Sequence, residues 1–232
     1  MATILVTGAA RGIGQATAEF FLTNGHQVIA LDRQWKGSSL ADHNALQRVD
    51  YDLQNTDGIR SMISDLPPVE TLVNNAGVLY VPPHDQFPVT QRKEIIAVNL
   101  EAPAELIESV LPAMKTRKAG RIVNVASVAA FTGHPDLWYG ITKAGILNMT
   151  KAYARFLGPH GVLVNAVAPG PTQTDMYEQL PQSRKDSVMA SVYSGRACKP
   201  EEVAESIYWL GTDSPAYVNG ATIDVNDGSY PR

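Results

Sequence analysis

The chain reads Thr3-Ile-Leu-Val-Thr-Gly-Ala-Ala-Arg-Gly-Ile-Gly14 close to its start, an apolar run followed by three spaced glycines. The apolar run predicts a buried strand, and the residues after Gly12 predict a helix that reaches Asn24. Glycines at such a junction permit a tight turn and let the backbone approach a pyrophosphate, which the free N–H groups of the helix start attract. Glycine-rich turns also simply join strands to helices, so this segment alone leaves both roles open.

The same alternation of short apolar runs and longer amphipathic stretches continues along the chain. Strands without polar alternation are typical of a parallel sheet covered on both faces, and helices between them imply right-handed crossovers. We therefore predict an α/β fold, one doubly wound domain over residues 1–232 with a seven-stranded parallel sheet and helices on both faces. The predicted strands are 3–7, 27–31, 46–49, 71–73, 121–125, 162–167 and 221–225, and the predicted helices are 12–24, 56–65, 91–118, 138–157 and 200–210. Segments 78–90 and 169–195 are expected to be irregular, with a substrate loop at about 176–195.

Composition excludes several other classes of protein. The 232 residues carry 19 basic and 23 acidic side chains without a block of like charge, so we expect no nucleic-acid partner. No apolar run approaches the ~18 residues of a membrane span, and no basic and apolar leader is visible, so we expect neither a membrane partner nor a secretory signal. A single cysteine, Cys198, excludes an internal disulfide and suits a cytoplasmic location. No metal site is expected either, because metal-ligand spacing is absent among His26, His43, His84 and His160.

Asp32 ends the second predicted strand, about 20 residues after the glycine-rich turn. An acid at this place accepts hydrogen bonds from the ribose hydroxyls of adenosine and repels a 2′-phosphate, although it could also cap the next turn. Arg33 and Arg11 complicate the choice, because either guanidinium could hold a 2′-phosphate. The sequence therefore favours NAD and leaves NADP open.

Tyr139 and Lys143 are spaced i, i+4 in a predicted helix, so both face the same side. An ammonium beside a phenol favours the phenolate and moves the tyrosine pKa toward working pH. Ser127 ends a predicted strand, where open α/β sheets place their ligand site, and Asn99 interrupts an apolar helical stretch. Each also has a structural alternative: an ordinary helix pair, a helix cap, or a buried amide bonded to backbone.

Taken together and in this order, these motifs resemble the short-chain dehydrogenase/reductase (SDR) family over essentially the whole chain. That family has a Rossmann fold and carries out NAD(P)-dependent oxidation and reduction. The matching motifs are Thr7-Gly-x-x-x-Gly-Ile-Gly14, Asp52-Leu53, Asn74-Asn-Ala-Gly77, Asn99, Ser127, Tyr139-x-x-x-Lys143, Pro169-Gly170 and Thr174. Two departures are a gap between Ser127 and Tyr139 that is one residue shorter than the common spacing, and Thr142 where serine is usual.

The resemblance implies four catalytic residues. Tyr139 would be the general acid/base for the reacting oxygen, and Ser127 would polarise the carbonyl. Lys143 would lower the tyrosine pKa and bind the nicotinamide ribose. Asn99 would hold a water that links Lys143 to solvent.

The resemblance also implies the residues that bind the cofactor. The phosphates would lie against the glycine-rich turn, the adenosine against the ends of the second and third strands, and the nicotinamide half against later loops. In that order the residues are Gly8, Arg11, Gly12, Ile13 and Gly14; Asp32, Arg33, Asp52 and Leu53; and Asn75, Ala76, Gly77, Tyr139, Lys143, Pro169, Gly170, Thr172 and Thr174.

The substrate is less well defined by sequence. Apolar and aromatic residues in 80–81, 131–138 and 176–193 predict a pocket for a small secondary alcohol or ketone, apolar or cyclic, with His134, Trp138, Met176 and Tyr177 as candidate contacts. His134 reads more naturally as a loop histidine than as a catalyst, because Tyr139 fills the acid/base role. The chain is similar to dihydrodiol-type dehydrogenases such as the 2,3-dihydro-2,3-dihydroxybenzoate dehydrogenases, and 3-oxoacyl carrier-protein reductases share most of its motifs.

Resemblance to the family further implies a homotetramer, or a homodimer, that buries the helices 91–118 and 138–157. Two alternatives stay open. A catalytically silent nucleotide-binding scaffold would be expected to lack a catalytic residue, whereas all four are present here. A nucleotide-sugar epimerase or dehydratase shares the Tyr-x-x-x-Lys pair but usually carries a separate substrate domain, for which 232 residues leave no room.

Overall fold

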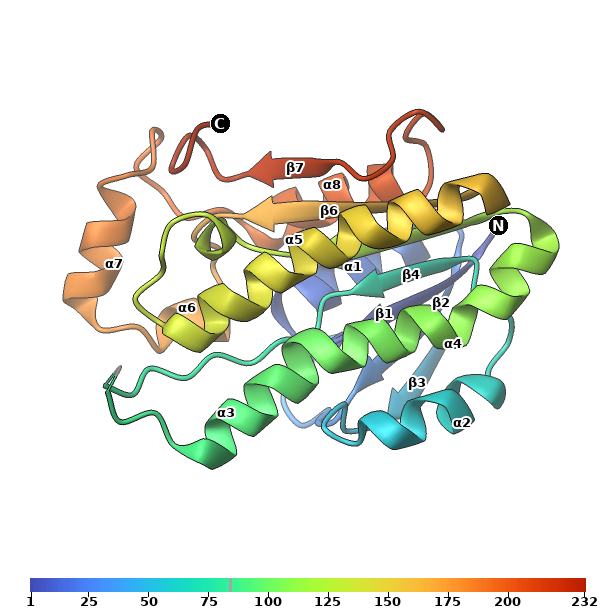
Figure 1. Cartoon of the computed structure of the whole chain (residues 1–232), viewed down its shortest axis with the longest axis horizontal. Helices are drawn as coiled ribbons and strands as arrows, with labels where there is room; N and C mark the ends of the chain where they lie inside the picture. Colours follow the sequence, from blue (N-terminus) through green and yellow to red (C-terminus); the bar gives the residue numbers. More distant parts are fainter. Residues whose placement is uncertain (84) are drawn as a thin grey trace.

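The computed structural model describes residues 1–83 and 85–232, and His84 lies outside the described residues. Seven parallel strands form one sheet in the order β3-β2-β1-β4-β5-β6-β7. The order reverses direction between β1 and β4, which is the doubly wound arrangement predicted above (Figure 1). The strands are β1 Thr3–Thr7, β2 Gln27–Asp32, β3 Leu46–Asp50, β4 Thr71–Asn74, β5 Gly120–Val125, β6 Val162–Pro169 and β7 Thr222–Val225. The predicted strands match these to within two residues at each end.

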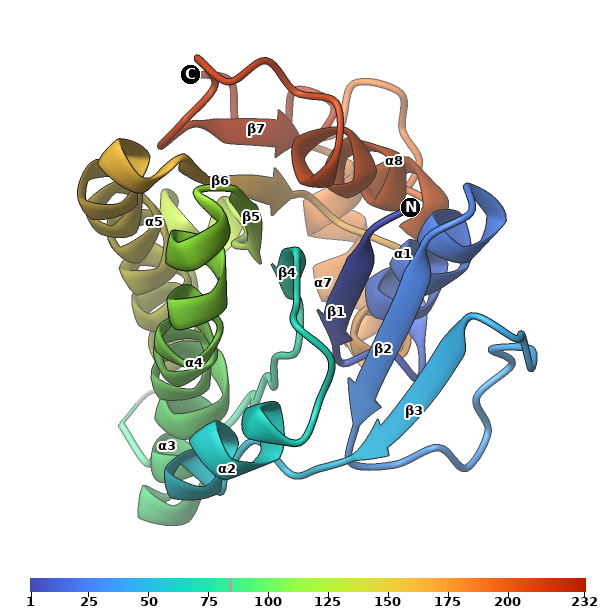
Figure 2. The ribbon, with the colours of Figure 1, turned by 90° about the vertical axis from the view of Figure 1, so that its right-hand side faces the viewer.

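Helices cover both faces of the sheet, as Figure 2 shows end-on. On one face, α1 and α8 pack against the strands through a buried cluster that includes Phe21, Val203 and Ile207. On the other face, α2, α4 and α5 build a second cluster. Each cluster forms because apolar residues at helical spacing meet strands whose side chains alternate between the two faces. The helices are α1 Gly12–Thr23, α2 Ile59–Ser64, α3 Val89–Ile96, α4 Ala102–Arg117, α5 Leu137–Leu157, α6 Asp175–Glu178, α7 Gln182–Met189 and α8 Pro200–Gly211.

The two edge strands differ from the prediction that every strand is buried on both faces. In β3, Gln47, Arg48 and Asp50 are exposed, and β7 is only partly buried. An edge strand has one neighbour, and polar side chains there blunt its free hydrogen-bonding edge. The short apolar runs predicted where the strands are. How deeply each strand is buried depends on its position in the sheet, which the runs do not reveal.

Two stretches also depart from the predicted helices. The helix predicted over 91–118 begins at Val89 and contains a π-helical turn, Ala97–Glu101, between α3 and α4. The segment expected to be irregular after β6 contains two short helices, α6 and α7. Because α7 is made almost wholly of polar residues, it carries no apolar periodicity that could have predicted it.

Buried polar side chains join β4, β5 and α5 inside the core. Asn74 donates through Nδ2 to Oδ1 of Asn124 at 2.9 Å, and Asn124 donates to Thr150 Oγ1 at 2.9 Å. All three residues are at most 4 % exposed. Such a chain of bonds fixes the mutual register of the elements that carry the site. Within residues 1–83 and 85–232, no helix combines the length and the apolar character that crossing a bilayer would require.

Candidate active site

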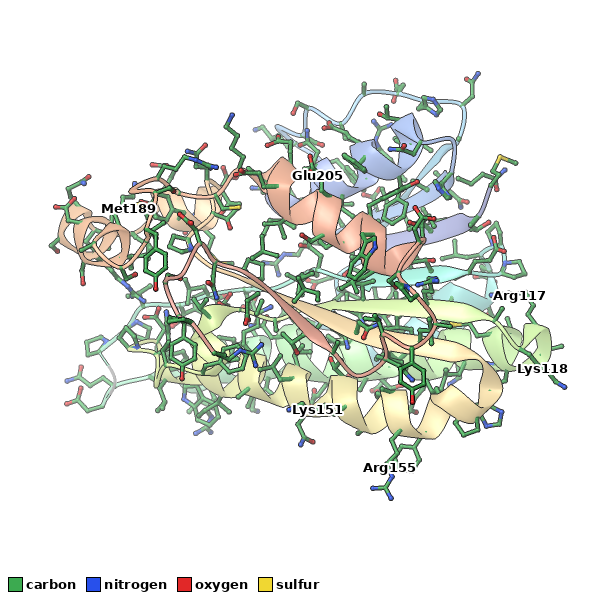
Figure 3. The ribbon with its side chains drawn as sticks, turned by 90° about the horizontal axis from the view of Figure 1, so that it is seen from above. Arg117, Lys118, Lys151, Arg155, Met189 and Glu205 are labelled. Atoms are coloured by element: carbon green, nitrogen blue, oxygen red, sulfur yellow. The ribbon has the colours of Figure 1, made fainter. Side chains whose placement is uncertain are left out.

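The candidate residues gather at the carboxyl edge of the sheet. In Figure 1 the arrowheads of β6 and β7 point to the side where α6 and α7 lie. Figure 3 shows Met189 of α7 at one end of the molecule and Arg117 and Lys118, which lead into β5, at the other. A doubly wound sheet binds its ligand at this edge, near the point where the strand order reverses.

The glycine-rich turn after β1 has the geometry that a phosphate site needs. Gly8 and Gly12 have φ values of 65° and 56°, in the left-handed region that favours glycine. A Cβ on Gly14 would lie 2.0 Å from the main-chain oxygen of Gly8, so no larger residue fits there. The N-cap residue Arg11 makes no capping bond with its side chain, and the first turn of α1 holds no acid. The positive end of this helix is therefore open to an anion, which fits the pyrophosphate of a dinucleotide.

The loop after β4 is bonded to this turn. Thr7 Oγ1 accepts hydrogen bonds from the main-chain N–H groups of Asn75 and Ala76, both at 3.0 Å. Asn75 Nδ2 donates to the main-chain oxygens of Thr7 and Gly8 at 2.9 and 3.2 Å. On the far side of the turn, a Cβ on Gly12 would lie 3.0 Å from Thr174. The structure thus brings the predicted residues after β1, β4 and β6 together.

Asp32 lies at the end of β2 and faces the phosphate turn. Its carboxylate accepts from the main-chain N–H of Ala10 at 3.0 Å and of Gln34 at 3.1 Å. The second of these bonds is the turn-capping role, and the first ties the acid to the cofactor turn. The capping alternative is therefore observed, while the contact of Asp32 with a ribose stays a prediction.

The neighbouring Arg33 points to a different group of residues. Its NH1 donates to Glu94 Oε1 of α3 at 3.0 Å and lies 3.7 Å from Asp52 Oδ2. Tyr80 donates to the other oxygen of Glu94 at 2.6 Å, and burial together with this bond raises the pKa of Tyr80 to about 12. Arg11 pairs with Asp175 at 3.3 Å. Both arginines that could hold a 2′-phosphate are thus paired with acids. Leu53, another predicted cofactor contact, is buried in the core cluster.

The catalytic candidates lie between β5 and α5. Lys143 is 5 % exposed and donates through Nζ to the main-chain oxygen of Val125 at 2.7 Å. Its ammonium lies 5.6 Å from the centre of the Tyr139 ring, and Ser127 lies near enough to Tyr139 to lower its pKa. Ser127 itself caps the turn that follows β5, since its Oγ accepts from the N–H of Ala129 at 3.1 Å. The cap role and the contact with Tyr139 therefore coexist.

Burial is the largest influence on the pKa of both Tyr139 and Lys143. It raises the pKa of Tyr139 to about 12, against the opposing influence of Ser127, and it lowers the pKa of Lys143 to about 8. The resemblance implied a lowered tyrosine pKa. Here the pKa is raised instead, because both groups lie in a low-dielectric site that disfavours either charged form.

Asn99 lies in the π-helical turn that splits the long helix. Its amide bonds both main-chain groups of Val78, with Oδ1 accepting at 2.8 Å and Nδ2 donating at 3.0 Å, and Nδ2 also lies 3.3 Å from Thr142 Oγ1. Thr142, the residue that departs from the family pattern, thus takes part in this contact. Gly77 lies against the same place, because a Cβ there would be 3.5 Å from Asn99 Oδ1 and 3.6 Å from Lys143 Nζ. Residue 77 thus lies within van der Waals distance of both polar groups.

The four candidate substrate residues lie in three places. The ring of His134 lies 5.7 Å from the ring of Tyr139, centre to centre, so His134 is beside the catalytic candidates. Trp138 instead packs against Phe87 and Arg92 near α3. Met176 and Tyr177 lie in α6, where Lys185 covers the ring of Tyr177 at 5.2 Å.

Three residues at the site escaped the sequence analysis: Glu94, Asp136 and Arg184. Asp136 is 5 % exposed and forms an ion pair with Arg184 of α7, with NH1 to Oδ1 at 2.9 Å. An acid just before a helix is normally taken for a cap, and an arginine in a polar helix for a surface residue, so neither carried a signal. Among the described residues, no group of three or more His, Cys, Asp or Glu side chains is arranged to hold a metal ion.

Comparison with known proteins identifies the class of enzyme. The chain matches the family described as enoyl-(acyl carrier protein) reductase over residues 8–229. It is 36 % identical to the 3-oxoacyl-acyl-carrier-protein reductase FabG of Thermotoga maritima, covering 97 % of this chain and 96 % of that protein. The fold and site therefore define an NAD(P)-dependent oxidoreductase that acts on CH–OH groups. The chain belongs to the short-chain dehydrogenase/reductase family.

Solved structures agree with this assignment. A chain assigned as an NAD(P)-dependent gluconate 5-dehydrogenase from Beutenbergia cavernae, with bound NADP, superposes with a TM-score of 0.93 at 31 % identity, covering 98 % of this chain and 96 % of that one. The 3-oxoacyl-acyl-carrier-protein reductase of Brucella melitensis gives 0.89 at 29 % identity, covering 100 % and 92 %. The prediction of a Rossmann-type SDR fold is confirmed.

Proposed function

We propose that Tyr139 is the general acid/base of this oxidoreductase and that Ser127 holds the reacting oxygen beside it. The observation that carries this proposal is that Ser127, Tyr139 and Lys143 meet at the carboxyl end of β5, with Ser127 near enough to lower the pKa of Tyr139 and the Lys143 ammonium 5.6 Å from the tyrosine ring. A bound nicotinamide supplies or accepts the hydride. The side chains of this protein orient the carbonyl or alcohol and move its proton.

Lys143 and Asn99 would assist the same reaction by binding the cofactor and passing on the proton. Lys143 uses one hydrogen on Val125, which leaves two for ligand hydroxyls such as those of the nicotinamide ribose. Its lowered pKa of about 8 means that it can also pass a proton near neutral pH. The amide of Asn99 is bonded to Val78, so it holds the loop over the lysine, and a water there would complete the proton path.

Replacing Tyr139 by Phe tests the mechanism. We expect turnover to fall by at least a hundredfold, in line with the usual size of acid/base catalysis, while binding of the nicotinamide cofactor changes little. Lys151→Gln, on the outer part of α5, serves as the control. Turnover that survives in Tyr139→Phe would exclude this mechanism, and an inactive but cofactor-binding wild type would favour the silent scaffold.

For the cofactor we propose NAD over NADP. The carboxylate of Asp32 at the end of β2 would repel a 2′-phosphate, and both nearby arginines are already paired with acids. The NADP found in the related structure is the counter-argument. Parallel titrations with NADH and NADPH, followed by nicotinamide fluorescence, test the proposal, and tighter binding of NADPH would contradict it.

For the substrate we propose a small secondary alcohol or ketone, apolar or cyclic. The two short helices α6 and α7 after β6 favour a confined pocket over a long channel. The alternative, reduction of a 3-oxoacyl thioester, is favoured by the similarity to FabG proteins. Assaying cyclic secondary alcohols with NAD against acetoacetyl thioesters with NADPH distinguishes the two.

We propose further that the protein is a cytoplasmic homotetramer or homodimer. Ile141 and Phe156 on α5 are 47 % and 69 % exposed, an apolar surface beside α4 that suits a partner copy. Light scattering of the purified protein measures the state directly. A Phe156→Glu variant is expected to shift it toward monomer, and an unaltered mass would contradict the use of this face.

A further inference from the structure

Helix α7 stands beside the site with almost no apolar anchor. None of its residues is buried, and its sequence Gln-Ser-Arg-Lys-Asp-Ser-Val-Met is mostly polar. Figure 1 shows it at the outer end of the molecule, beyond the carboxyl ends of the strands. The hydrophobic effect therefore contributes little to holding α7 in place, and another interaction must fix it.

That interaction is a buried ion pair with the segment that precedes α5. Arg184 donates through NH1 to Asp136 Oδ1 at 2.9 Å and through NH2 to Oδ2. The side chain of Asp136 is 4 % exposed and that of Arg184 is 19 % exposed. The other strong contact of α7, between Lys185 and Glu178, reaches only α6. Because a buried charge without its partner is strongly unfavourable, the Arg184–Asp136 pair resists opening once it has formed.

His134 completes the cluster and connects it to the catalytic residues. Arg184 NH2 lies 3.3 Å from His134 Nε2, and His134 Nδ1 lies 3.4 Å from Asp136 Oδ2. An arginine only donates, so Nε2 faces a donor, and Nδ1 accepts from the main-chain N–H of Asp136 at 3.2 Å. Because both ring nitrogens face donors, the doubly protonated ring, which has no acceptor, is disfavoured. Burial lowers the pKa of His134, which also favours the neutral form. The ring then lies against Tyr139, with 5.7 Å between the ring centres.

We propose that Arg184 and Asp136 are a positioning pair: closing α7 onto Asp136 both docks the substrate helix and neutralises a carboxylate that would otherwise face Tyr139. The charged and titratable groups that the structure relates to Tyr139 are Lys143 on its own helix and His134 and Asp136 on the preceding segment, and Arg184 of α7 is bonded to the last two. The negative charge of Asp136 raises the pKa of Tyr139, and Arg184 is the cation that offsets it. When α7 is away from Asp136, the charge of Asp136 is not offset and Tyr139 ionises less readily. When α7 is docked, Arg184 offsets that charge and Tyr139 ionises more readily.

The proposal rests on the role of Tyr139 given above, and two measurements without substrate test it separately from that role. Hydrogen exchange of peptides that cover α7 reports docking. The NMR titration of tyrosine labelled with carbon-13 at Cζ, assigned with Tyr139→Phe, reports the ionisation of Tyr139. A charge about 10 Å away at an effective dielectric constant of about 20 shifts a pKa by about one unit. Turnover in Tyr139→Phe would remove the catalytic role but would leave both of these measurements interpretable.

Four variants separate the effects. Arg184→Gln should speed exchange of α7 at least tenfold and lower the ionised fraction of Tyr139 at pH 11 by about tenfold, whereas Asp136→Asn should raise that fraction about fivefold. The double variant Asp136→Asn/Arg184→Gln, which has no unpaired buried charge, should exchange rapidly yet titrate like wild type. Lys185→Gln, the neighbouring cation on α7, should change neither measurement. If Arg184→Gln leaves exchange or the Tyr139 titration as in wild type, or if the double variant titrates like Arg184→Gln, the proposal is overturned.

Discussion

Replacing Glu94 by Gln should let this protein bind NADPH while its affinity for NADH changes little. Glu94 is a partner of the Arg33 guanidinium, at 3.0 Å, and Asp52 is more distant at 3.7 Å. Gln keeps the size of the side chain and its oxygen can still accept from Tyr80, so the local structure should persist. Without the negative charge, Arg33 becomes available to a 2′-phosphate.

The magnitude follows from comparing two interactions of the same guanidinium. The side chain of Arg33 is 45 % exposed, and an ion pair at such a site contributes at most about 1 kcal/mol. A charge-assisted hydrogen bond from arginine to phosphate contributes about 1.5–3 kcal/mol. In wild type the phosphate must first displace Glu94, whereas in Glu94→Gln it need not, so the variant gains at most about 1 kcal/mol, which corresponds to roughly a fivefold gain in NADPH affinity.

Titration of NADH and NADPH into wild type, Glu94→Gln and the double variant Arg33→Met/Glu94→Gln measures the effect. The gain should appear in Glu94→Gln and vanish in the double variant, because it acts through Arg33. Glu108→Gln is a matched control, since Glu108 also accepts from a tyrosine and lies near an arginine, but far from the cofactor turn. An unchanged NADPH affinity in Glu94→Gln, or an equal gain without Arg33, would refute the reasoning.

Three further predictions concern ionisation, the core and the phosphate turn. Lys143 has a pKa of about 8 in the folded chain against 10.5 unfolded, so the unfolded state binds more protons between these values. The free energy of unfolding should therefore rise with pH in this range, by up to about 3 kcal/mol. Urea unfolding from pH 7 to 10 should show this rise in wild type but not in Lys143→Met, and an equal dependence on pH in both would disprove the prediction. Asn124→Ala leaves the buried Asn74 amide without its acceptor and should cost about 2–4 kcal/mol in the same assay, with a loss below about 1 kcal/mol counting against it. Gly14→Ala places a Cβ 2.0 Å from a main-chain oxygen and should abolish cofactor binding with circular dichroism preserved, whereas Gly37→Ala, whose Cβ meets nothing within 4 Å, should bind normally.

The sequence predicted the fold well because the signals for it are local. Each strand is an apolar run bounded by turn residues, and β1 ends at Thr7, as its pattern indicated. These local signals fail where the structure of a segment depends on the elements packed beside it. Gln47 and Arg48 are exposed because β3 is an edge strand, and the π turn at Ala97–Glu101 interrupts an otherwise continuous helical pattern.

The site could be predicted only as far as its motifs reach. Ser127, Tyr139 and Lys143 follow from a strand end and an i, i+4 spacing, and the structure brings them together. The raised pKa of Tyr139 was not predictable, because it depends on how completely the folded chain removes the phenol from water. Likewise, Trp138 was expected near the substrate, and only packing shows it against Phe87 and Arg92.

The sequence by itself determined the order of strands and helices, the glycine-rich turn after β1 and the set of candidate catalytic side chains, because each is carried by a local motif. Only the tertiary structure decided how charge is arranged around them. Arg33 meets Glu94 across 61 positions of sequence, and Arg184 meets Asp136 across 48. Such pairs form when separate crossovers return to one edge of the sheet, and no local spacing encodes which charges meet there.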